Sequence, residues 1–335
     1  MRSPCKASIV LAAAMLLVAI GRPVAQTPSA APLQLEAKIP LGEVQGRIDH
    51  LAIDLARQRL FVAELGNNTV GVVDLHERKV IASLDGLKEP QGVGYVPSLQ
   101  TLYVANAGDG SVRVYLGGEY APAGKIELGA DADNIRIDPA TERVFVGYGD
   151  GGLAVIDARA FRKVADIALP VHPESFQLDR ASDRIFVNLP KVRAIAVVDR
   201  EAVRPTETWP MVTAEGNFPM ALNAAAGHVL AVFRSPAALG VFAAKDGSPI
   251  ASVDICGDAD DVFLDARRKR VYISCGEGFL DVLDAGGDDY KRVARIPTIA
   301  GARTSLFVPE LDRLYLAARA TQQEPASVWV FRPTP

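Results

Sequence analysis

The sequence predicts an all-β fold, a seven-bladed β-propeller with four antiparallel strands in each blade. Three observations support this prediction: one unit repeats along the chain, no helical periodicity interrupts the repeats, and one unpaired strand stands at the N-terminal end. The most regular part of the unit is a short apolar strand behind a turn, usually of the form Asp-x-x-x-x-Arg. This anchor strand begins at Leu60, Leu102, Val144, Ile185, Val229, Val271 and Leu314. A period of roughly 40 to 45 residues is typical of propeller blades.

Each repeat divides into four strands. The first is the apolar run before the turn, such as 51–53, and the second is the anchor strand, such as 60–62. The third follows a loop rich in Gly, Asn and Asp, as at 72–74, and the fourth is an alternating segment such as 165–169. Clusters of turn-forming residues separate these strands, which is the pattern of consecutive hairpins.

The two ends of the repeat region complement each other. The seventh copy stops after its third strand at 328–331, and a segment with the character of a fourth strand stands alone at 35–41. Pairing the two would remove an exposed sheet edge, which otherwise invites aggregation. We therefore expect one domain over 33–335, a ring that the N-terminal strand closes.

Residues 1–25 have the pattern of a signal peptide. Arg2 and Lys6 precede an apolar run at 8–20, which is shorter than the roughly 20 residues that span a membrane. An uncleaved membrane anchor is the alternative. Cleavage is expected near Ala25 or Ala30, and 26–32 is expected to be a flexible lead-in. The protein would then be periplasmic or secreted, with no membrane insertion after signal cleavage.

Charge and cysteine content narrow the class of partner. The predicted signal carries Arg2, Lys6 and Arg22 and no acidic residue, so its removal takes the net charge from −4 to −7. An acidic protein is a poor ligand for nucleic acid, whose binding depends on neutralising phosphates. Cys256 and Cys275 remain, and in an oxidising compartment they are candidates for a disulfide, with two free thiols as the alternative.

The second repeat carries a family resemblance. Its strand 102–106 (LYVAN), the Gly-Asp-Gly turn at 108–110 and the strand 111–114 resemble the unit of the YVTN-repeat β-propeller family. That family includes exported bacterial proteins and belongs to a wider superfamily with lactonase-like and WD40-like propellers. The resemblance implies the fold. It leaves the function open, because the repeated residues are scaffold residues.

Polar residues converge where the first strand of each repeat begins. The pairs at these positions are Asp49-His50, Gln91-Gly92, Asp133-Asn134, Glu174-Ser175, Phe218-Pro219, Asp260-Asp261 and Arg303-Thr304. The alternating positions that follow, such as Leu51 and Ile53, are apolar. This pattern predicts a packed ring with a polar mouth, where a small polar ligand or a protein partner would bind. The candidate ligand-binding residues are Asp49, His50, Gln91, Asp133, Asn134, Glu174, Asp260, Asp261 and Arg303. The alternative is that these polar side chains only cap loops.

Further hypotheses concern the chemistry of this mouth and the role of one long loop. Oxygen ligands from Asp133, Asn134, Glu174, Asp260 and Asp261 suit a Ca²⁺ ion, whereas Arg47, Arg234 and Arg303 would instead balance the carboxylates. A lactonase-type hydrolase would use His50, His172 or Glu174 as its acid or base. A structural module that binds another protein would use the loop at 318–325, which is longer than its counterparts.

Overall fold

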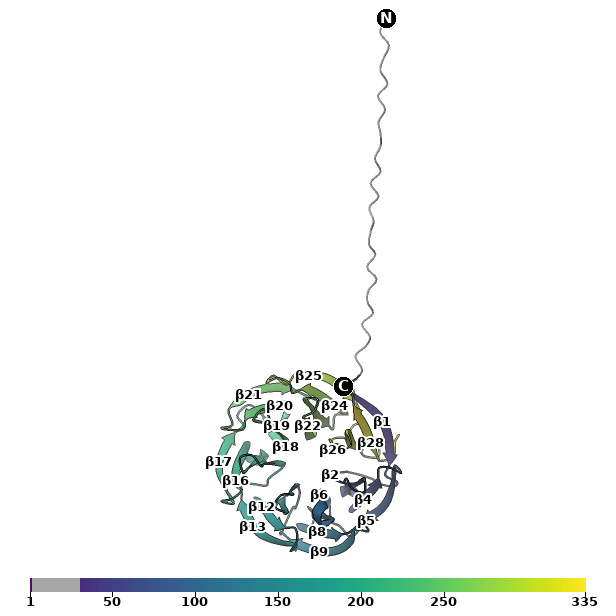
Figure 1. The fold of residues 1–335 in the computed structure, drawn as a ribbon, viewed down its shortest axis with the longest axis vertical. Helices are drawn as coiled ribbons and strands as arrows, with labels where there is room; N and C mark the ends of the chain where they lie inside the picture. The colour runs from purple at the N-terminus through teal and green to yellow at the C-terminus, as the bar shows by residue number, and fades with distance from the viewer. Residues whose placement is uncertain (2–30) are drawn as a thin grey trace. The chain divides into compact units, whose positions relative to one another are not determined.

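The structure is a computed structural model that describes residue 1 and residues 31–335. Over the described residues the chain forms seven four-stranded antiparallel sheets arranged in a ring (Figure 1), which confirms the predicted propeller. The predicted signal peptide and most of the predicted lead-in lie outside the described residues. Among those described, no helix is long and apolar enough to span a membrane.

The strands occupy four positions from the channel to the outer surface. The innermost are β2 (Leu51–Asp54), β6 (Pro90–Val96), β10 (Ile135–Asp138), β14 (Phe176–Asp179), β18 (Glu215–Asn223), β22 (Ala259–Asp265) and β26 (Ser305–Val308). The second position, the predicted anchor strands, is taken by β3 (Arg59–Glu64), β7 (Thr101–Asn106), β11 (Arg143–Tyr148), β15 (Arg184–Leu189), β19 (His228–Ser235), β23 (Arg270–Cys275) and β27 (Arg313–Ala318).

The third position is taken by β4 (Thr69–Asp74), β8 (Ser111–Leu116), β12 (Gly152–Asp157), β16 (Ala194–Asp199), β20 (Ala237–Ala243), β24 (Phe279–Asp284) and β28 (Ser327–Pro333). The outermost strands are β5 (Lys79–Leu84), β9 (Ala121–Glu127), β13 (Arg162–Ala168), β17 (Arg204–Pro210), β21 (Pro249–Asp254), β25 (Arg292–Pro297) and β1 (Leu33–Pro40). Within residues 31–335, three single-turn 3₁₀ helices lie between strands: η1 (Leu65–Asn67), η2 (Pro97–Leu99) and η3 (Pro190–Val192).

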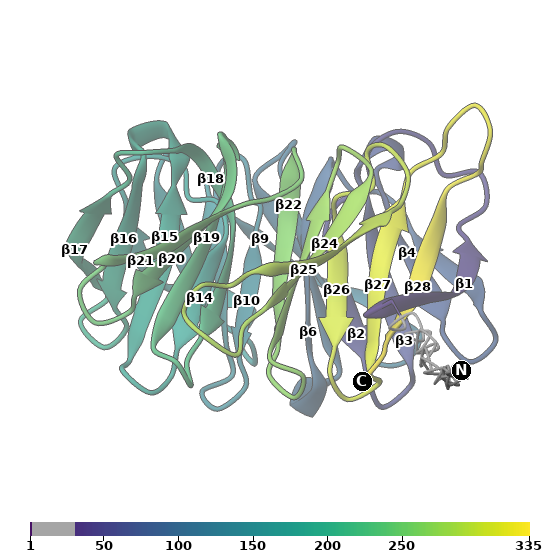
Figure 2. The same ribbon diagram turned by 90° about the horizontal axis from the view of Figure 1, so that it is seen from above.

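The seventh blade is assembled from both ends of the described chain, as predicted. Strand β1 pairs antiparallel with β28, from Leu33 opposite Pro333 to Pro40 opposite Ser327. Leu33 and Ile39 are buried at this joint. In Figures 1 and 2 the purple strand β1 lies beside the yellow strand β28. The ring therefore has no unpaired third strand in this blade.

The turn motif of the repeat is a hydrogen-bonded cap. Asp54, Asp138, Asp179 and Asp265 are buried, and each accepts a hydrogen bond from a backbone N–H two or three residues further along. Asp residues at the ends of the third strands accept backbone hydrogen bonds in the same way, as Asp74 does from His76 and Glu77. These repeated carboxylates belong to the scaffold.

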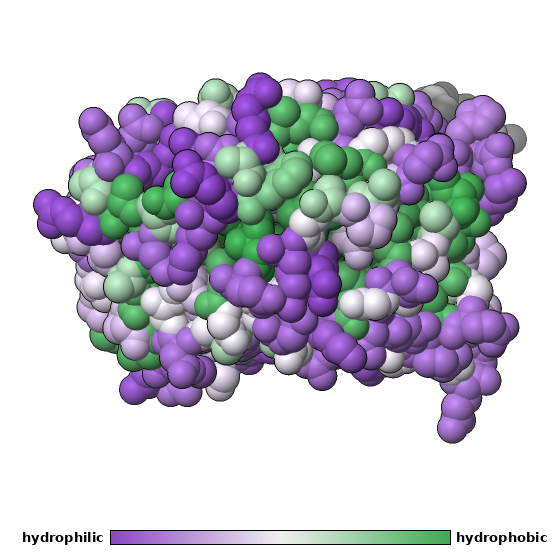
Figure 3. Space-filling model, turned by 90° about the horizontal axis from the view of Figure 1, so that it is seen from below, coloured by the Kyte–Doolittle hydropathy of each residue, from purple (hydrophilic) through white to green (hydrophobic). Residues whose placement is uncertain are grey.

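Burial follows the position of a strand in its blade. The second and third strands are buried almost continuously, because neighbouring blades cover both of their faces. The outermost strands alternate, as β5 does from Lys79 to Leu84. Several of the exposed large apolar side chains lie on these outer strands, including Ile81, Val164 and Val293. In the side view of Figure 3, hydrophobic residues accordingly appear on the wall of the molecule among hydrophilic ones.

One end of the ring gathers the loops that precede the innermost strands and the loops between second and third strands. The backbone N–H of Gly66 donates to the carbonyl of Arg47, and that of Gly108 to the carbonyl of Lys88. We call this end the mouth. The blade 7 loop at this end, 319–326, is the longest of its kind and projects in Figure 2.

Candidate functional site

The mouth contains a small polar cavity of about 30 Å³. It is lined by Arg47, Asp49, His50, Gln91, Asp133, Asn134, Glu174, Ser175, Phe218 and Asp260. Seven of the nine ligand-binding candidates are in this lining. Of the other two, Asp261 lines the central channel and Arg303 forms an ion pair with Asp260. The structure thus brings together residues from six blades that the sequence spacing placed at one end of the ring.

His50 lies among carboxylates. Its Nε2 is 3.7 Å from Oδ1 of Asp49, and its Nδ1 is 3.8 Å from Oδ1 of Asp261. Burial alone would lower the pKa of His50, but Asp261, Asp49 and Asp133 together raise it to about 10. The imidazole is therefore a cation at neutral pH, and a protonated His is a poor general base.

Asp133 and Asn134 present buried oxygen atoms without a donor. Both side chains are more than nine-tenths buried, and Oδ1 of each has no hydrogen-bond partner among the described residues. Burial raises the pKa of Asp133 to about 8, despite the opposing charge of His50. Burial also raises the pKa of Glu174 on the same rim. Unpartnered buried acceptors cost roughly 1–3 kcal/mol each, so this corner of the cavity has unused capacity to bind donors.

The blade 6 side of the mouth is an ion-pair network. Nη2 of Arg234 donates to Oδ1 of Asp260 at 2.5 Å, and Nε of Arg303 lies 2.9 Å from its Oδ2. Arg303 also binds both carboxylate oxygens of Asp258, at 2.8 and 3.0 Å. The guanidinium of Arg234 stacks over the ring of Phe218, 3.9 Å from its centroid. The carboxylate of Asp260 is thus held by two arginines.

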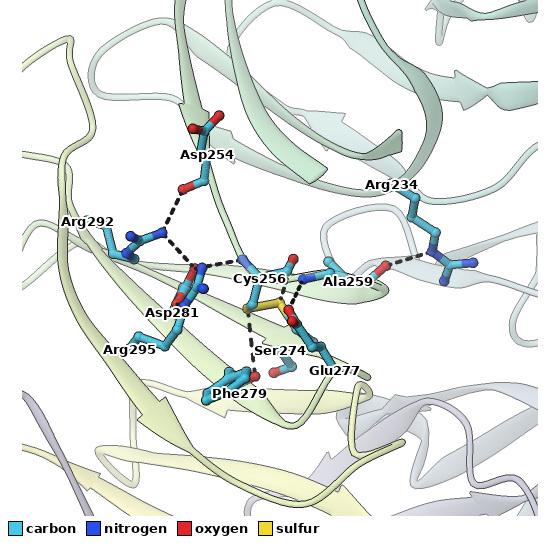
Figure 4. The surroundings of a disulfide bond; sticks show 12 residues. Arg234, Asp254, Cys256, Ala259, Ser274, Glu277, Phe279, Asp281, Arg292 and Arg295 are labelled. Atoms are coloured by element: carbon cyan, nitrogen blue, oxygen red, sulfur yellow. Dashed lines mark hydrogen bonds and ion pairs between the residues drawn. A yellow bond between two sulfur atoms is a disulfide. The ribbon is translucent and has the colours of Figure 1, made fainter. Parts of the chain in front are cut away.

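A disulfide lies next to the segment that carries Asp258 and Asp260. Cys256 and Cys275 are joined, with their Cα atoms 5.8 Å apart. Figure 4 shows the backbone N–H of Cys256 donating to Asp281, a fully buried carboxylate that Arg295 also binds. The crosslink therefore holds the first residue of the segment that carries Asp258 and Asp260.

The central channel is hollow, whereas the sequence predicted a packed ring. Its cavity has a volume of about 490 Å³ and reaches the mouth at His50 and Ser175, which line both spaces. Leu51 and Ile53 line this cavity and also pack against the core between blades 1 and 7, and they do not fill it. The channel-facing row is the position between them, eight residues before each anchor: Ala52, Gly94, Arg136, Gln177, Ala221, Phe263 and Leu306. Three of its seven members are Ala or Gly, so the space is left open.

Arg136 and Gln177 are site residues that sequence reasoning missed. Nη1 of Arg136 donates to the carbonyl of Ile135 at 2.8 Å, and its Nη2 donates to Oγ of Ser175 at 3.1 Å. Nε2 of Gln177 donates to the carbonyl of Met220 at 2.7 Å. A signal was present, because aligning the repeats shows long polar side chains at this channel-facing position only in blades 3 and 4.

Two of the sequence hypotheses find little geometric support. Nδ1 of His172 lies 2.6 Å from the carbonyl oxygen of Gly149, and His172 lines neither cavity. Within residues 31–335, no three His, Cys, Asp or Glu side chains are grouped so that they could hold one metal ion. The carboxylate of Asp260 forms ion pairs with Arg234 and Arg303. Oδ2 of Asp261 accepts a hydrogen bond from the backbone N–H of Ser305 at 2.8 Å.

Comparisons with known proteins bear on the fold. No protein-family model and no curated protein sequence matches this chain. A chain of the structure titled Kuenenia stuttgartiensis hydrazine synthase superposes with a TM-score of 0.76 at 19% identity, covering 85% of this chain and 95% of that one. A chain of the mitotic checkpoint complex superposes with a TM-score of 0.72 at 14% identity, covering 96% of this chain and 98% of that one. At such identities the likeness shows the propeller fold alone. The YVTN resemblance stays a prediction.

Proposed function

We propose that this protein is an exported binding propeller that holds a small ligand at its mouth. The ligand would donate N–H or O–H hydrogen bonds to Asp133 and Asn134. The observation that carries the proposal is the pair of buried, unpartnered acceptor oxygens in a cavity that opens onto a hollow channel. Unpaired polar atoms of this kind are rare in native interiors and require an explanation. A ligand with donor groups satisfies both atoms.

A lactonase-type hydrolase receives less support from the same geometry. His50, the best-placed candidate base, is raised to a pKa of about 10 by its carboxylate neighbours. His172 lines neither cavity. Binding without turnover is therefore the function that this arrangement serves best. Assays with lactones and esters would revise this conclusion if the parent protein showed turnover and His50→Ala lost it at a temperature where that variant is still folded.

The central test compares two carboxylates of different kinds. Asp133→Asn removes a buried acid whose folded-state pKa of about 8 exceeds its ordinary value of 3.8. Ionising this acid destabilises the fold as pH rises through about 8, so the variant should melt higher than the parent protein at about pH 9. Asp138→Asn is the matched control, since Asp138 caps a turn with hydrogen bonds from Ala140 and Thr141. This control should melt at a lower temperature than the parent protein. Its free energy of unfolding should be smaller by roughly 1 kcal/mol or more.

The ligand arm of the test uses thermal-shift titrations with small amines, amino alcohols and polyols. We expect at least one class to raise the melting temperature of the parent protein and of Asp138→Asn, but not of Asp133→Leu, which removes the acceptor oxygen that asparagine would keep. A destabilised Asp133→Asn, together with an unchanged ligand response of Asp133→Leu, would show that Asp133 is only a cap. CaCl₂ added after chelation belongs in the same series, and a rise lost in both Asp133→Asn and Asp261→Asn would support the calcium hypothesis.

A further inference from the structure

Arg136 is the cation of this site that lacks a counter-ion. Arg47, His50, Arg234 and Arg303 each have a carboxylate oxygen within 4.0 Å. Arg136 has none within that distance among the described residues, and its two hydrogen bonds go to neutral groups, the carbonyl of Ile135 and the hydroxyl of Ser175. Each of the four mouth cations thus has a carboxylate partner, whereas the positive charge of Arg136 at the channel wall has none among the described residues.

An uncompensated guanidinium inside a protein is costly. Removing the charge from water is unfavourable unless an opposite charge or a full set of hydrogen bonds replaces the hydration. Burial accordingly lowers the pKa of Arg136, and the charges of Asp261 and Asp133 counteract this effect only in part. A guanidinium has five N–H donors. Protein acceptors take two of the Arg136 donors, so the rest can bind an anion.

The channel around Arg136 suits the apolar part of a small molecule. Tyr95, Met220, Phe263 and Leu306 line it from four different blades. Its volume of about 490 Å³ falls within the roughly 300–1,000 Å³ of small-ligand pockets. Gly94 and the short side chains of the channel-facing row leave this space unfilled, although larger apolar residues at those positions would close it. The ring therefore combines an apolar chamber with one unpaired cation.

We propose that the channel binds a small organic anion, with its acid group on Arg136 and Ser175 and its apolar body in the chamber. A carboxylate matches the planar guanidinium and forms paired, charge-assisted hydrogen bonds with it. Ser175 lines both cavities, so the acid group would lie where the mouth meets the channel. The inference rests on the proposed function only in that the mouth gives access to the channel.

Calorimetric titration with matched eight-carbon probes tests the proposal. Octanoate, octylamine and octanol share one apolar tail and differ in the charge of the head group. We expect octanoate to bind the parent protein more tightly than the other two. Arg136→Gln should weaken octanoate binding on the order of 30-fold and leave octanol binding nearly unchanged. Arg193→Gln is the control, because Arg193 is an exposed arginine that pairs with Glu215 on the surface.

Melting temperatures establish that the variants are folded. Arg136→Gln should melt at or above the temperature of the parent protein, since it removes a partly buried charge that has no carboxylate partner. If Arg136→Gln fails to fold, Arg136→Lys replaces it and should lose part of the octanoate affinity, because a lysine cannot form the paired hydrogen bonds. The proposal is overturned if octanoate does not bind, if Arg136→Gln binds it unchanged, or if octylamine binds best.

The two proposals fail separately. If octanoate binds through Arg136 while Asp133→Leu alters no ligand response, the channel inference stands and the role of the mouth acceptors is wrong. If amines or polyols bind through Asp133 and no octanoate binds, the proposed function stands and the channel inference is wrong.

Discussion

At the scale of single residues, the mouth contains a histidine, His50, that is surrounded by carboxylates. Its ring lies between Asp49 and Asp261, and Asp133 contributes a third acidic neighbour. The folded-state pKa of about 10 exceeds the ordinary value of 6.5. The resulting stabilisation is therefore complete below about pH 6.5 and is lost as the pH rises through about 10.

Replacing His50 with Gln should expose this dependence. We expect His50→Gln to lower the free energy of unfolding by about 3 kcal/mol at about pH 6, because carboxylates are left buried without their cation. The difference from the parent protein should shrink steadily towards about pH 10. Urea denaturation across this range measures it, with His76→Gln as the exposed control. A loss that is constant with pH would assign His50 a packing role instead.

Sequence reasoning found the mouth residues and missed the channel residues for a physical reason. Asp133 and Glu174 precede an innermost strand, where polar side chains stand out against the apolar pattern. Arg136 lies inside a strand between Ile135 and Ile137, two of the apolar positions that the pattern predicts to fill the ring. Which face of an innermost strand meets the channel depends on the tilt of the blade, and a period of two leaves that choice open.

At the scale of elements, the disulfide and the start of β22 act together. Cys256 is held to Cys275 on β23, and the backbone of Cys256 is also bound by Asp281 on β24. The segment between Cys256 and Asp261 carries the carboxylates that bind Arg234 and Arg303. Its conformation therefore depends on three strands of one blade.

Removing this crosslink should reduce stability and loosen the blade 6 side of the mouth. Replacing both cysteines with serine should lower the free energy of unfolding by about 3 kcal/mol, the value expected for a loop of this length. Urea denaturation of the variant and of the parent protein, each with and without reductant, provides the measurement. Equal stability of the two proteins without reductant, together with thiol labelling of the denatured parent protein, would show that the bridge is absent.

Element types were predictable because each strand position has its own pattern. Anchor strands are continuous apolar runs, and outer strands alternate, as Lys79–Leu84 does. The starts of the innermost strands were less predictable. Strands β6, β18 and β22 extend into the mouth and include Gln91, Phe218 and Asp260, since pairing with the second strand continues there through register shifts that no turn residue marks.

At the scale of the whole molecule, closure of the ring depends on β1. Ile39 is buried against the first and seventh blades. Ile39→Ala should lower the free energy of unfolding by about 3 kcal/mol, because it opens a cavity at the joint. Leu35→Ala on the same strand removes an exposed side chain and should change stability by less than about 0.5 kcal/mol.

Unfolding followed by two probes measures this effect. Trp329 lies in the closing blade and Trp209 in the blade on β17, so fluorescence of single-tryptophan variants reports on two parts of the ring, with circular dichroism as a global signal. We expect both transitions to shift together. If only the Trp329 transition shifts, blade 7 opens on its own and the ring is not one cooperative unit.

The global architecture was the most predictable level. Seven anchor strands at nearly equal spacing, and the complementary ends at 35–41 and 328–331, suffice to define a closed ring of four-stranded blades. The hollow channel was not predictable in the same way. Its volume depends on the sizes of seven side chains brought together from across the chain, and no local pattern reports their sum.

The pairing of β1 with β28 also determines when blade 7 can form during synthesis of the chain. A ribosome makes Leu33–Pro40 first and Ser327–Pro333 last, so the first strand has no partner until nearly the whole ring has been synthesised. An unpaired strand edge is a hazard for association with other chains during that interval. Blade 7 is accordingly the last blade that can form, and a chain released before Ser327 retains an open edge beside β27.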